Sequence, residues 1–179
     1  MKIIHILGVF AAFCAPIDAG IYNVPKEESV VAIEFPEAWK VIQEDDTIDA
    51  RSKDESIQLY VQLDDADTLE ASIEKSIKYF KDEGVVVDVA SQKQTEGEIN
   101  AMAMTTVKWE GVHGDAPTKV ALSFITVAPE EFVTLLYWGD DNSAKANVEV
   151  LQKIMMSIKS LKAGAEEAGA DEGEEIEAE

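Results

Sequence analysis

The chain has 179 residues, a formal net charge of −21 and a single cysteine. A charge of this sign and size repels phosphate groups, so it argues against nucleic acid and anionic membrane surfaces as partners. One cysteine cannot form an intramolecular disulfide bond, so the stability of the domain must come from packing.

The N-terminal segment predicts export. Lys2 precedes an apolar run that ends at Phe13, followed by a short exit of small residues, so we expect residues 1–19 to be removed as a signal peptide. The run is too short for a transmembrane helix. Lipidation of Cys14 is the lesser alternative, because a phenylalanine stands where lipidated precursors have a small residue. We therefore expect a periplasmic or extracellular protein without stable membrane insertion.

Extended segments dominate the first part of the exported chain. Residues 30–35 predict a short apolar strand, which Pro36 ends because proline cannot donate a hydrogen bond to a ladder. Residues 39–43 and 47–51 predict two further extended pieces on either side of an acidic turn. Residues 56–63 alternate between apolar and polar side chains, which predicts a half-buried strand.

A helix is predicted next, at residues 68–83. Asp67 and Glu70 have the spacing of a capping box, and Gly84 suits the left-handed position that ends a helix. Four apolar residues fall on one face of this helix: Leu69, Ile73, Ile77 and Phe80. The helix therefore needs an apolar surface to cover.

The centre of the fold is predicted to be a meander of three strands at residues 101–110, 118–127 and 132–138. A strand at residues 85–90 leads into it through a turn at residues 95–98. The connections are short and contain no helix, so neighbouring strands must pair antiparallel. Both faces of the meander carry apolar side chains, so both need cover.

A second helix is predicted after the meander. A wide apolar stripe at helical spacing supports it: Val148, Leu151, Ile154, Met155, Ile158 and Leu161. Gly164 is expected to end this helix. Residues 163–179 hold eight acidic residues and no basic residue. Such a segment cannot bury enough apolar surface to offset its chain entropy, so we expect a disordered acidic tail.

These elements predict a single α+β domain at residues 20–162. The expected architecture is an α/β/α sandwich, a twisted and largely antiparallel sheet of about six strands with a helix on each face. With its opening strand closed by Phe-Pro-Glu-Ala-Trp at residues 35–39, this order resembles the PsbP-like superfamily. That group includes photosystem II PsbP, a Ran-binding transport factor and DcrB-like bacterial exported proteins. Its members bind different partners, so the resemblance implies a fold and no particular reaction.

One loop offers a candidate functional pair. His113 lies in the predicted turn at residues 111–117 and is followed by Asp115, which would make it an exposed base oriented by a carboxylate. A solvated loop histidine is the favoured interpretation, because a catalytic site needs a converging set of groups. The exported chain has no cysteine and no second histidine, which excludes a usual zinc site. We therefore predict no enzyme activity and no cofactor.

Two oxygen-rich clusters, at residues 64–67 and 140–143, are candidate calcium ligands or helix caps. Neither has the spacing, or the following glycine and glutamate, of a calcium-binding loop. Each stands before a predicted helix, where aspartate and asparagine are favoured as caps. Capping is therefore the favoured interpretation.

Two functions from different classes remain. The favoured one is a non-catalytic accessory or protein-interaction module of the cell envelope, with an unidentified protein partner. The alternative is a small-molecule or lipid carrier, with Met104, Trp109 and Trp138 as candidate lining residues of a cleft between helix and sheet, although core packing explains the same residues. An apolar cleft of roughly several hundred cubic ångströms would favour the carrier, whereas an exposed apolar patch over a closed core would favour a protein partner.

Overall fold

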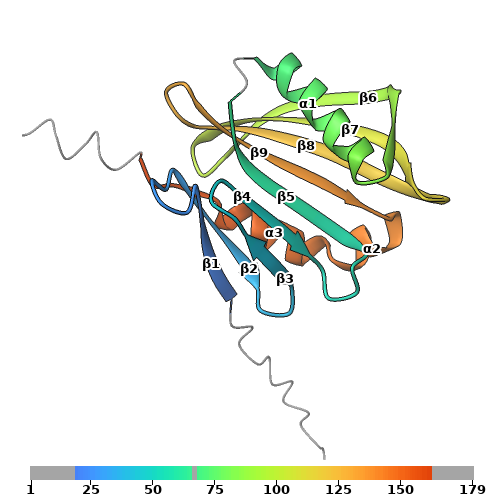
Figure 1. The fold of residues 1–179 in the computed structure, drawn as a ribbon, viewed down its shortest axis with the longest axis horizontal. Helices are drawn as coiled ribbons and strands as arrows, with labels where there is room; N and C mark the ends of the chain where they lie inside the picture. Colours follow the sequence, from blue (N-terminus) through green and yellow to red (C-terminus); the bar gives the residue numbers. More distant parts are fainter. Residues whose placement is uncertain (1–18, 66–67, 163–179) are drawn as a thin grey trace, which may run out of the picture.

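The structure, a computed structural model, describes residues 19–65 and 68–162 (Figure 1). The strands are β1 (Ala19–Val24), β2 (Val31–Pro36), β3 (Lys40–Gln43), β4 (Thr47–Arg51), β5 (Ile57–Asp64), β6 (Val85–Ile99), β7 (Met102–His113), β8 (Ala116–Ala128), β9 (Glu131–Gly139) and β10 (Lys159–Ser160). The helices are α1 (Leu69–Asp82), α2 (Asp141–Ala146) and α3 (Val148–Ser157). Among the described residues, no helix is long and apolar enough to cross a bilayer. The predicted signal peptide up to residue 18, the predicted helix end at Gly164 and the acidic tail lie outside the described residues.

The strands form two antiparallel sheets. The larger has seven strands in the order β3-β4-β5-β9-β8-β7-β6, and the smaller has three in the order β1-β2-β10. β5 pairs with β9 from Ile57↔Gly139 to Asp64↔Phe132, which joins the N-terminal strands to the meander. The antiparallel meander is confirmed. The prediction of about six strands was too low. The larger sheet has seven strands because β3, β4 and β5 all join it, and β2 pairs with β1 and β10 in a separate smaller sheet.

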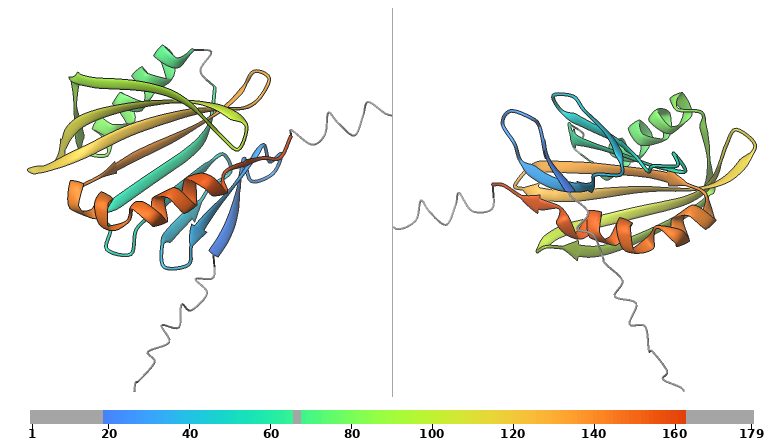
Figure 2. Two further views of the ribbon diagram at one scale, coloured as in Figure 1. Left: turned by 180° about the vertical axis from the view of Figure 1, so that it is seen from behind. Right: turned by 90° about the horizontal axis from the view of Figure 1, so that it is seen from below.

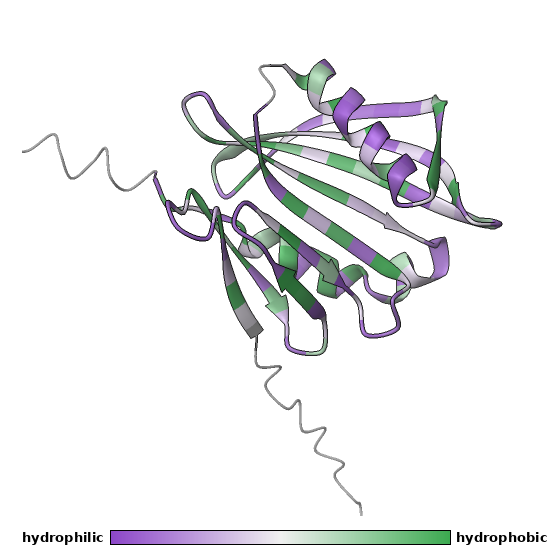
Figure 3. Ribbon diagram, in the orientation of Figure 1, coloured by the Kyte–Doolittle hydropathy of each residue, from purple (hydrophilic) through white to green (hydrophobic). Residues whose placement is uncertain are grey.

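Both faces of the larger sheet are covered by other elements (Figure 2), and apolar side chains are buried on each face. Trp138 of β9 packs in one cluster with Phe80 of α1. Val133 of the same strand belongs to the opposite cluster, which contains Ile154 of α3 and residues of the smaller sheet. Figure 3 shows the matching alternation of hydropathy along the central strands. The two long helices therefore lie on opposite faces of the larger sheet, and the smaller sheet shares one face with α3.

The hairpin between β6 and β7 turns later than predicted. β6 continues through residues 95–98, and the chain reverses at Asn100 and Ala101, whose φ angles are +47° and +64°. Two positive φ angles are what a two-residue hairpin needs, and asparagine adopts this conformation more readily than most residues. Gly97, which suggested the earlier turn, lies within the ladder opposite Met104.

The first helix starts close to the predicted position but has a different cap. Thr68 is the N-cap, and its hydroxyl accepts a hydrogen bond from the N–H of Ala71 at 3.2 Å. Asp67, the predicted cap, lies outside the described residues. After the helix, Gly84 has a φ of +80°, the left-handed conformation expected there.

The second predicted helix is two short helices followed by a strand. Asn147 separates α2 from α3. The backbone becomes extended at Ile158, with ψ of 123°, and β10 then pairs with β2. Leu161, expected in the helix, donates its N–H to the carbonyl of Val30 at 2.9 Å. The helix prediction was wrong here because the edge of β2 offers hydrogen bonds that the apolar spacing does not reveal.

Asn100 connects the β6–β7 hairpin to the end of α3. Its side-chain amide donates to the carbonyls of Met156 at 2.9 Å and Ile158 at 2.6 Å. We expect Asn100→Ala to lower the free energy of unfolding by about 2 kcal/mol, because it removes both hydrogen bonds and places alanine at a positive φ. Asn100→Gly should cost less, since glycine tolerates this φ and loses only the hydrogen bonds. Urea denaturation measures both, and equal losses would contradict a conformational role for Asn100.

Candidate functional site

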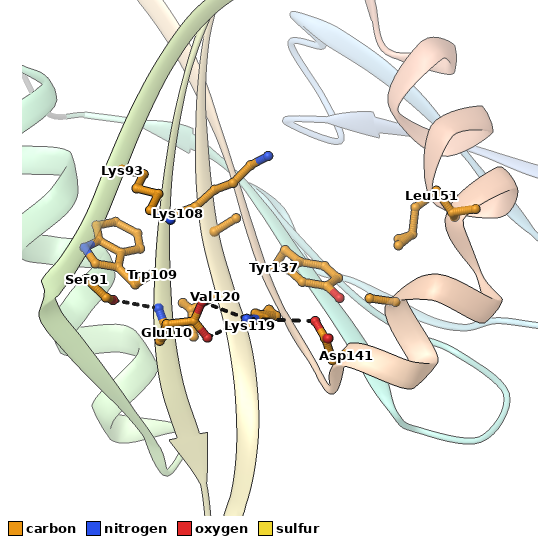
Figure 4. Close-up of a pocket in the computed structure, with 13 residues that line it drawn as sticks. Ser91, Lys93, Lys108, Trp109, Glu110, Lys119, Val120, Tyr137, Asp141 and Leu151 are labelled. Carbon is orange, nitrogen blue, oxygen red and sulfur yellow. Dashed lines mark hydrogen bonds and ion pairs between the residues drawn. The ribbon is translucent and has the colours of Figure 1, made fainter.

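A cleft of about 570 Å³ lies between the larger sheet and the helices α2 and α3 (Figure 4). We call it the sheet–helix cleft. Side chains of the sheet form its floor, among them Lys108, Ala121 and Tyr137, and the helices form a wall with Ala144, Val148 and Leu151. Its exposed lining is mainly apolar. The volume lies in the range of small-molecule sites, which is about 300–1,000 Å³.

The register of the strands explains why the sheet–helix cleft forms at this position. Lys93, Lys108, Ala121 and Tyr137 are successive partners across β6, β7, β8 and β9. Directly paired residues share a face, so these four side chains form one row, which we call the floor row. Tyr137 packs against the cluster that contains Ile154 of α3, which places the row beneath that helix. Ala121 is the smallest member and leaves space in front of the helix.

Contacts at the two ends of the helical segment hold it above the floor row. At the C-terminal end, Ile154 is buried and the hydroxyl of Ser157 accepts a hydrogen bond from the N–H of Glu34 in β2 at 2.8 Å. At the N-terminal end, Asp141 of α2 lies 3.9 Å from the ammonium group of Lys119 in β8. The segment formed by α2 and α3 is therefore held to the sheet at both of its ends. The cleft is the space between the middle of this segment and the sheet.

Paired charges close one end of the cleft. Lys119 Nζ lies 2.6 Å from Glu110 Oε2, and Lys145 Nζ lies 3.0 Å from Asp141 Oδ2. The hydrogen bond to Glu110 raises the pKa of Lys119. These groups are exposed, so the pairs add little to stability. They connect α2 to the sheet at this end.

The other end carries two lysines that have no acidic partner in the described part of the chain. Lys93 and Lys108 stand directly opposite each other in the β6–β7 ladder. Within residues 19–65 and 68–162, neither ammonium group has a hydrogen bond or an ion pair. Like charges at directly opposed positions destabilise a sheet. In Figure 4 these two side chains lie at one end of the cleft, and the Glu110–Lys119–Asp141 chain lies at the other.

Tyr137 ends the floor row, and its hydroxyl oxygen lies beside Gly139, near Asp140 and Asp141. Its ring is half-buried, and its buried hydroxyl oxygen has no hydrogen-bond partner among the described residues. Burial, followed by the charges of Asp140 and Asp141, raises the pKa of Tyr137 to about 12. The hydroxyl therefore stays neutral at physiological pH and keeps a proton that it can donate.

The three residues predicted to line an apolar cleft lie on different faces of the larger sheet. Trp109 borders the sheet–helix cleft, but it packs in the opposite core and its indole N–H donates to Gln92 Oε1 at 3.2 Å. Trp138 lies in that same core, with its ring 5.7 Å from that of Phe80. Met104 packs on the α3 face, away from the residues that line the cleft. The structure therefore does not bring these three residues together.

His113 and Asp115 lie at the β7–β8 turn, which is tighter than the predicted loop at residues 111–117. β7 ends at His113, and the chain turns through Gly114 with a φ of +61°. Both candidate side chains are exposed, and within the described part of the chain neither hydrogen-bonds the other. A catalytic role for this pair stays a prediction.

The oxygen-rich clusters contact the helices that follow them. Asp140 Oδ1 caps α2 as predicted, accepting hydrogen bonds from two backbone N–H groups at 2.9 and 3.0 Å. In the first cluster Asp64 accepts a hydrogen bond from the hydroxyl of Ser72 in α1, and Asp65 lies 2.6 Å from Lys75 Nζ, while Asp67 lies outside the described residues. Residues 19–65 and 68–162 contain no group of three or more His, Cys, Asp or Glu side chains placed to hold a metal ion.

The cap at Asp140 predicts a pH dependence of stability. Hydrogen bonds from the hydroxyl and the N–H of Ser143 hold the pKa of Asp140 below its usual value. The cap therefore stabilises the folded state at neutral pH and loses this contribution as the pH falls through the lowered pKa. We expect Asp140→Asn, which keeps an acceptor oxygen but carries no charge, to lower Tm at neutral pH and to reduce its fall between about pH 5 and about pH 3. Thermal unfolding at each pH tests this, and an unaltered fall would count against the cap.

Sequence reasoning did not single out the floor row. The predicted strand at residues 85–90 stopped before Lys93, and the β6–β7 register shifts between Asp88 and Lys93. A signal was nevertheless present. Lys93 and Lys108 are equally far from the turn at Asn100 and Ala101, so placing that turn correctly pairs them by counting outward along both strands.

No family model matches the sequence, and no curated protein matches it. Solved structures match its fold. Cyanobacterial PsbP (CyanoP) from Synechocystis has a TM-score of 0.57 and 10% identity over 83% of this chain and 95% of that one. LpqN of Mycobacterium tuberculosis has a TM-score of 0.51 and 9% identity over 79% and 91%. The Ran-binding protein Mog1p of Saccharomyces cerevisiae has a TM-score of 0.50 and 9% identity over 82% and 98%.

The chain shares the fold of these three proteins, the PsbP-like fold. The resemblance inferred from the order of elements is thereby confirmed at the level of fold. At these identities the likeness carries no functional residue from one protein to another. The function of this PsbP-like chain must therefore be argued from its own cleft and surface.

Proposed function

We propose that this PsbP-like protein is an exported, non-catalytic accessory protein of the cell envelope, and that it carries a small molecule or lipid in the sheet–helix cleft. The observation that carries the proposal is the cleft itself, with a volume of about 570 Å³ and a mainly apolar lining. A concave apolar site with a few polar groups is the usual form of a small-molecule site. Among the two functions that the sequence left open, this geometry favours the carrier.

Two observations support an envelope location. The N-terminal residues have the layout of a secretory signal peptide. LpqN, which shares the fold, is involved in cell envelope biogenesis. A non-catalytic role agrees with the exposed position of His113, which has no orienting carboxylate among the described residues.

A protein-interaction module is the second candidate, and the free edge of β6 favours it. β6 is the outer strand of the larger sheet. Val86 and Val89 of this strand are 62% and 58% exposed, and Val112 beside it is 40% exposed. Exposed apolar residues on an unpaired edge suit a partner that adds a strand.

Purification from the native envelope fraction tests the proposal. The tagged protein would be isolated under mild conditions, and its small molecules and co-purifying proteins identified by mass spectrometry. We expect a reproducible small molecule that is absent from the Ala121→Leu variant, because leucine at the floor projects into the cleft and obstructs its middle. A stoichiometric protein partner that Val112→Lys abolishes, with no small molecule, would favour the second candidate instead.

A further inference from the structure

The polar groups of the sheet–helix cleft are distributed unevenly. Glu110, Lys119 and Asp141 pair with one another at one end. Lys93 and Lys108 at the other end have no acidic partner in residues 19–65 and 68–162. The described part of the cleft therefore has unneutralised positive charge at one end only, in a chain whose formal net charge is −21.

We infer that the ligand of the cleft is an anionic amphiphile, whose carboxylate or phosphate head group binds between Lys93 and Lys108 and whose apolar body lies between Ala121 and Leu151. This inference rests on the proposed carrier function and names its ligand class.

The paired lysines supply the head-group site. Lys93 and Lys108 occupy directly opposed positions on the same face of the sheet, so their ammonium groups repel each other. An anionic oxygen between them relieves this repulsion and accepts charge-assisted hydrogen bonds from both, which are stronger than neutral ones. A cationic head group would add to the repulsion, and a neutral one would leave it in place.

The side chains next to the lysines suit an aliphatic body. Ala121 follows Lys108 in the floor row, and Val148 and Leu151 of α3 face it across the cleft. Val148 is 49% exposed, so a ligand in the cleft would remove apolar surface from water. Burial of apolar surface of this kind favours binding.

Tyr137 follows Ala121 in the floor row, and its hydroxyl oxygen lies beside Gly139. This buried oxygen has no partner among the described residues, which is a costly arrangement for a polar group. Because the oxygen is buried, Tyr137→Phe should leave the affinity for dodecanoate unchanged.

Isothermal titration of the delipidated protein, with all probes below their micelle concentrations, tests the inference. The probes are dodecanoate, dodecyl phosphate, dodecanol, dodecyltrimethylammonium and inorganic phosphate. We expect dodecanoate and dodecyl phosphate to bind about tenfold or more tightly than dodecanol, and the cationic probe and inorganic phosphate to bind more weakly still. The ratio between the two anionic probes tells whether the site prefers a carboxylate or a phosphate.

Matched variants locate the head group. The double variant Lys93→Gln and Lys108→Gln should weaken binding of the anionic probes by about tenfold or more and leave dodecanol unchanged. Lys40→Gln, on the opposite edge strand β3, is the control and should change nothing. Ala121→Leu should weaken binding of all the amphiphiles, and its Tm reports whether it still folds.

The outcomes separate this inference from the carrier function. If dodecanol binds as tightly as dodecanoate, or the double lysine variant loses nothing, the anionic specificity is wrong while the carrier function stands. If inorganic phosphate binds as tightly as dodecyl phosphate, the site holds an anion and not an amphiphile. If no probe binds and the native protein yields no small molecule, both the inference and the carrier function are overturned.

Discussion

Phe80→Ala is expected to lower the free energy of unfolding by about 3 to 5 kcal/mol. The side chain is fully buried, and its ring meets the ring of Trp138 edge-on, with centroids 5.7 Å apart and an interplanar angle of 88°. The other buried residues of α1 are the small Ser72 and Ser76. Phe80 is therefore the one fully buried apolar side chain of this helix, with Ile73 and Tyr79 packed partly buried beside it.

Urea denaturation of the protein measures the effect of Phe80→Ala. Lys78→Ala is the matched control, because Lys78 is exposed on the same helix and its loss should change stability by less than about 0.5 kcal/mol. Phe80 lies on the face opposite the sheet–helix cleft. The variant should therefore keep its affinity for an amphiphile wherever it remains folded. A loss below about 1 kcal/mol would show that α1 is held by other contacts.

Periodicity predicted the parts of this fold in which one face of an element is buried. The alternation in β5 and the apolar stripe that ends at Phe80 identified a strand and a helix, and the structure places both as expected. Short connections then forced the antiparallel meander. These inferences hold because one-sided burial gives a strand an apolar residue at every second position and a helix one at every third or fourth position, a pattern that is visible within a single segment.

The errors arose where structure depends on backbone conformation or on a distant partner. The turn at Asn100 and Ala101 uses positive φ angles without a glycine, so the glycine in residues 95–98 misled the prediction. The segment from Ile158 to Leu161 continues the apolar spacing of a helix, yet it extends to pair with the edge of β2. The apolar spacing of a segment does not show whether a distant strand has an edge available for pairing.

The candidate site was harder to predict than the fold for a related reason. The floor row takes one residue from each of four strands. It can therefore be predicted only when the registers of all three strand pairs are known. Met104, Trp109 and Trp138 were chosen from the sequence because large apolar side chains often line ligand clefts. Trp109 and Trp138 instead pack in the core on the other face of the sheet. In contrast, Ala121 contributes to the cleft by its small size, which no motif reports.

The position of α3 is what keeps the cleft open, and Ile154→Ala tests it. Ile154 is the one buried residue of α3, and it packs in the cluster shared with the smaller sheet. We expect its truncation to lower the free energy of unfolding by about 2 to 5 kcal/mol. Because the helix wall of the cleft depends on this contact, the variant should also bind dodecanoate at least several-fold more weakly in conditions where it stays folded.

Two further variants make this prediction specific. Ile154→Val should cost about 0.5 to 1.5 kcal/mol, because it removes a single methyl group from the same contact. Met156→Ala is the control, since Met156 is 62% exposed on α3 and its loss should change neither stability nor binding. Urea denaturation gives the stabilities, and titration with dodecanoate gives the affinities. If Ile154→Ala lost stability but bound dodecanoate as the unaltered protein does, the ligand site would not depend on the position of α3, and the amphiphile would have to bind elsewhere on the sheet.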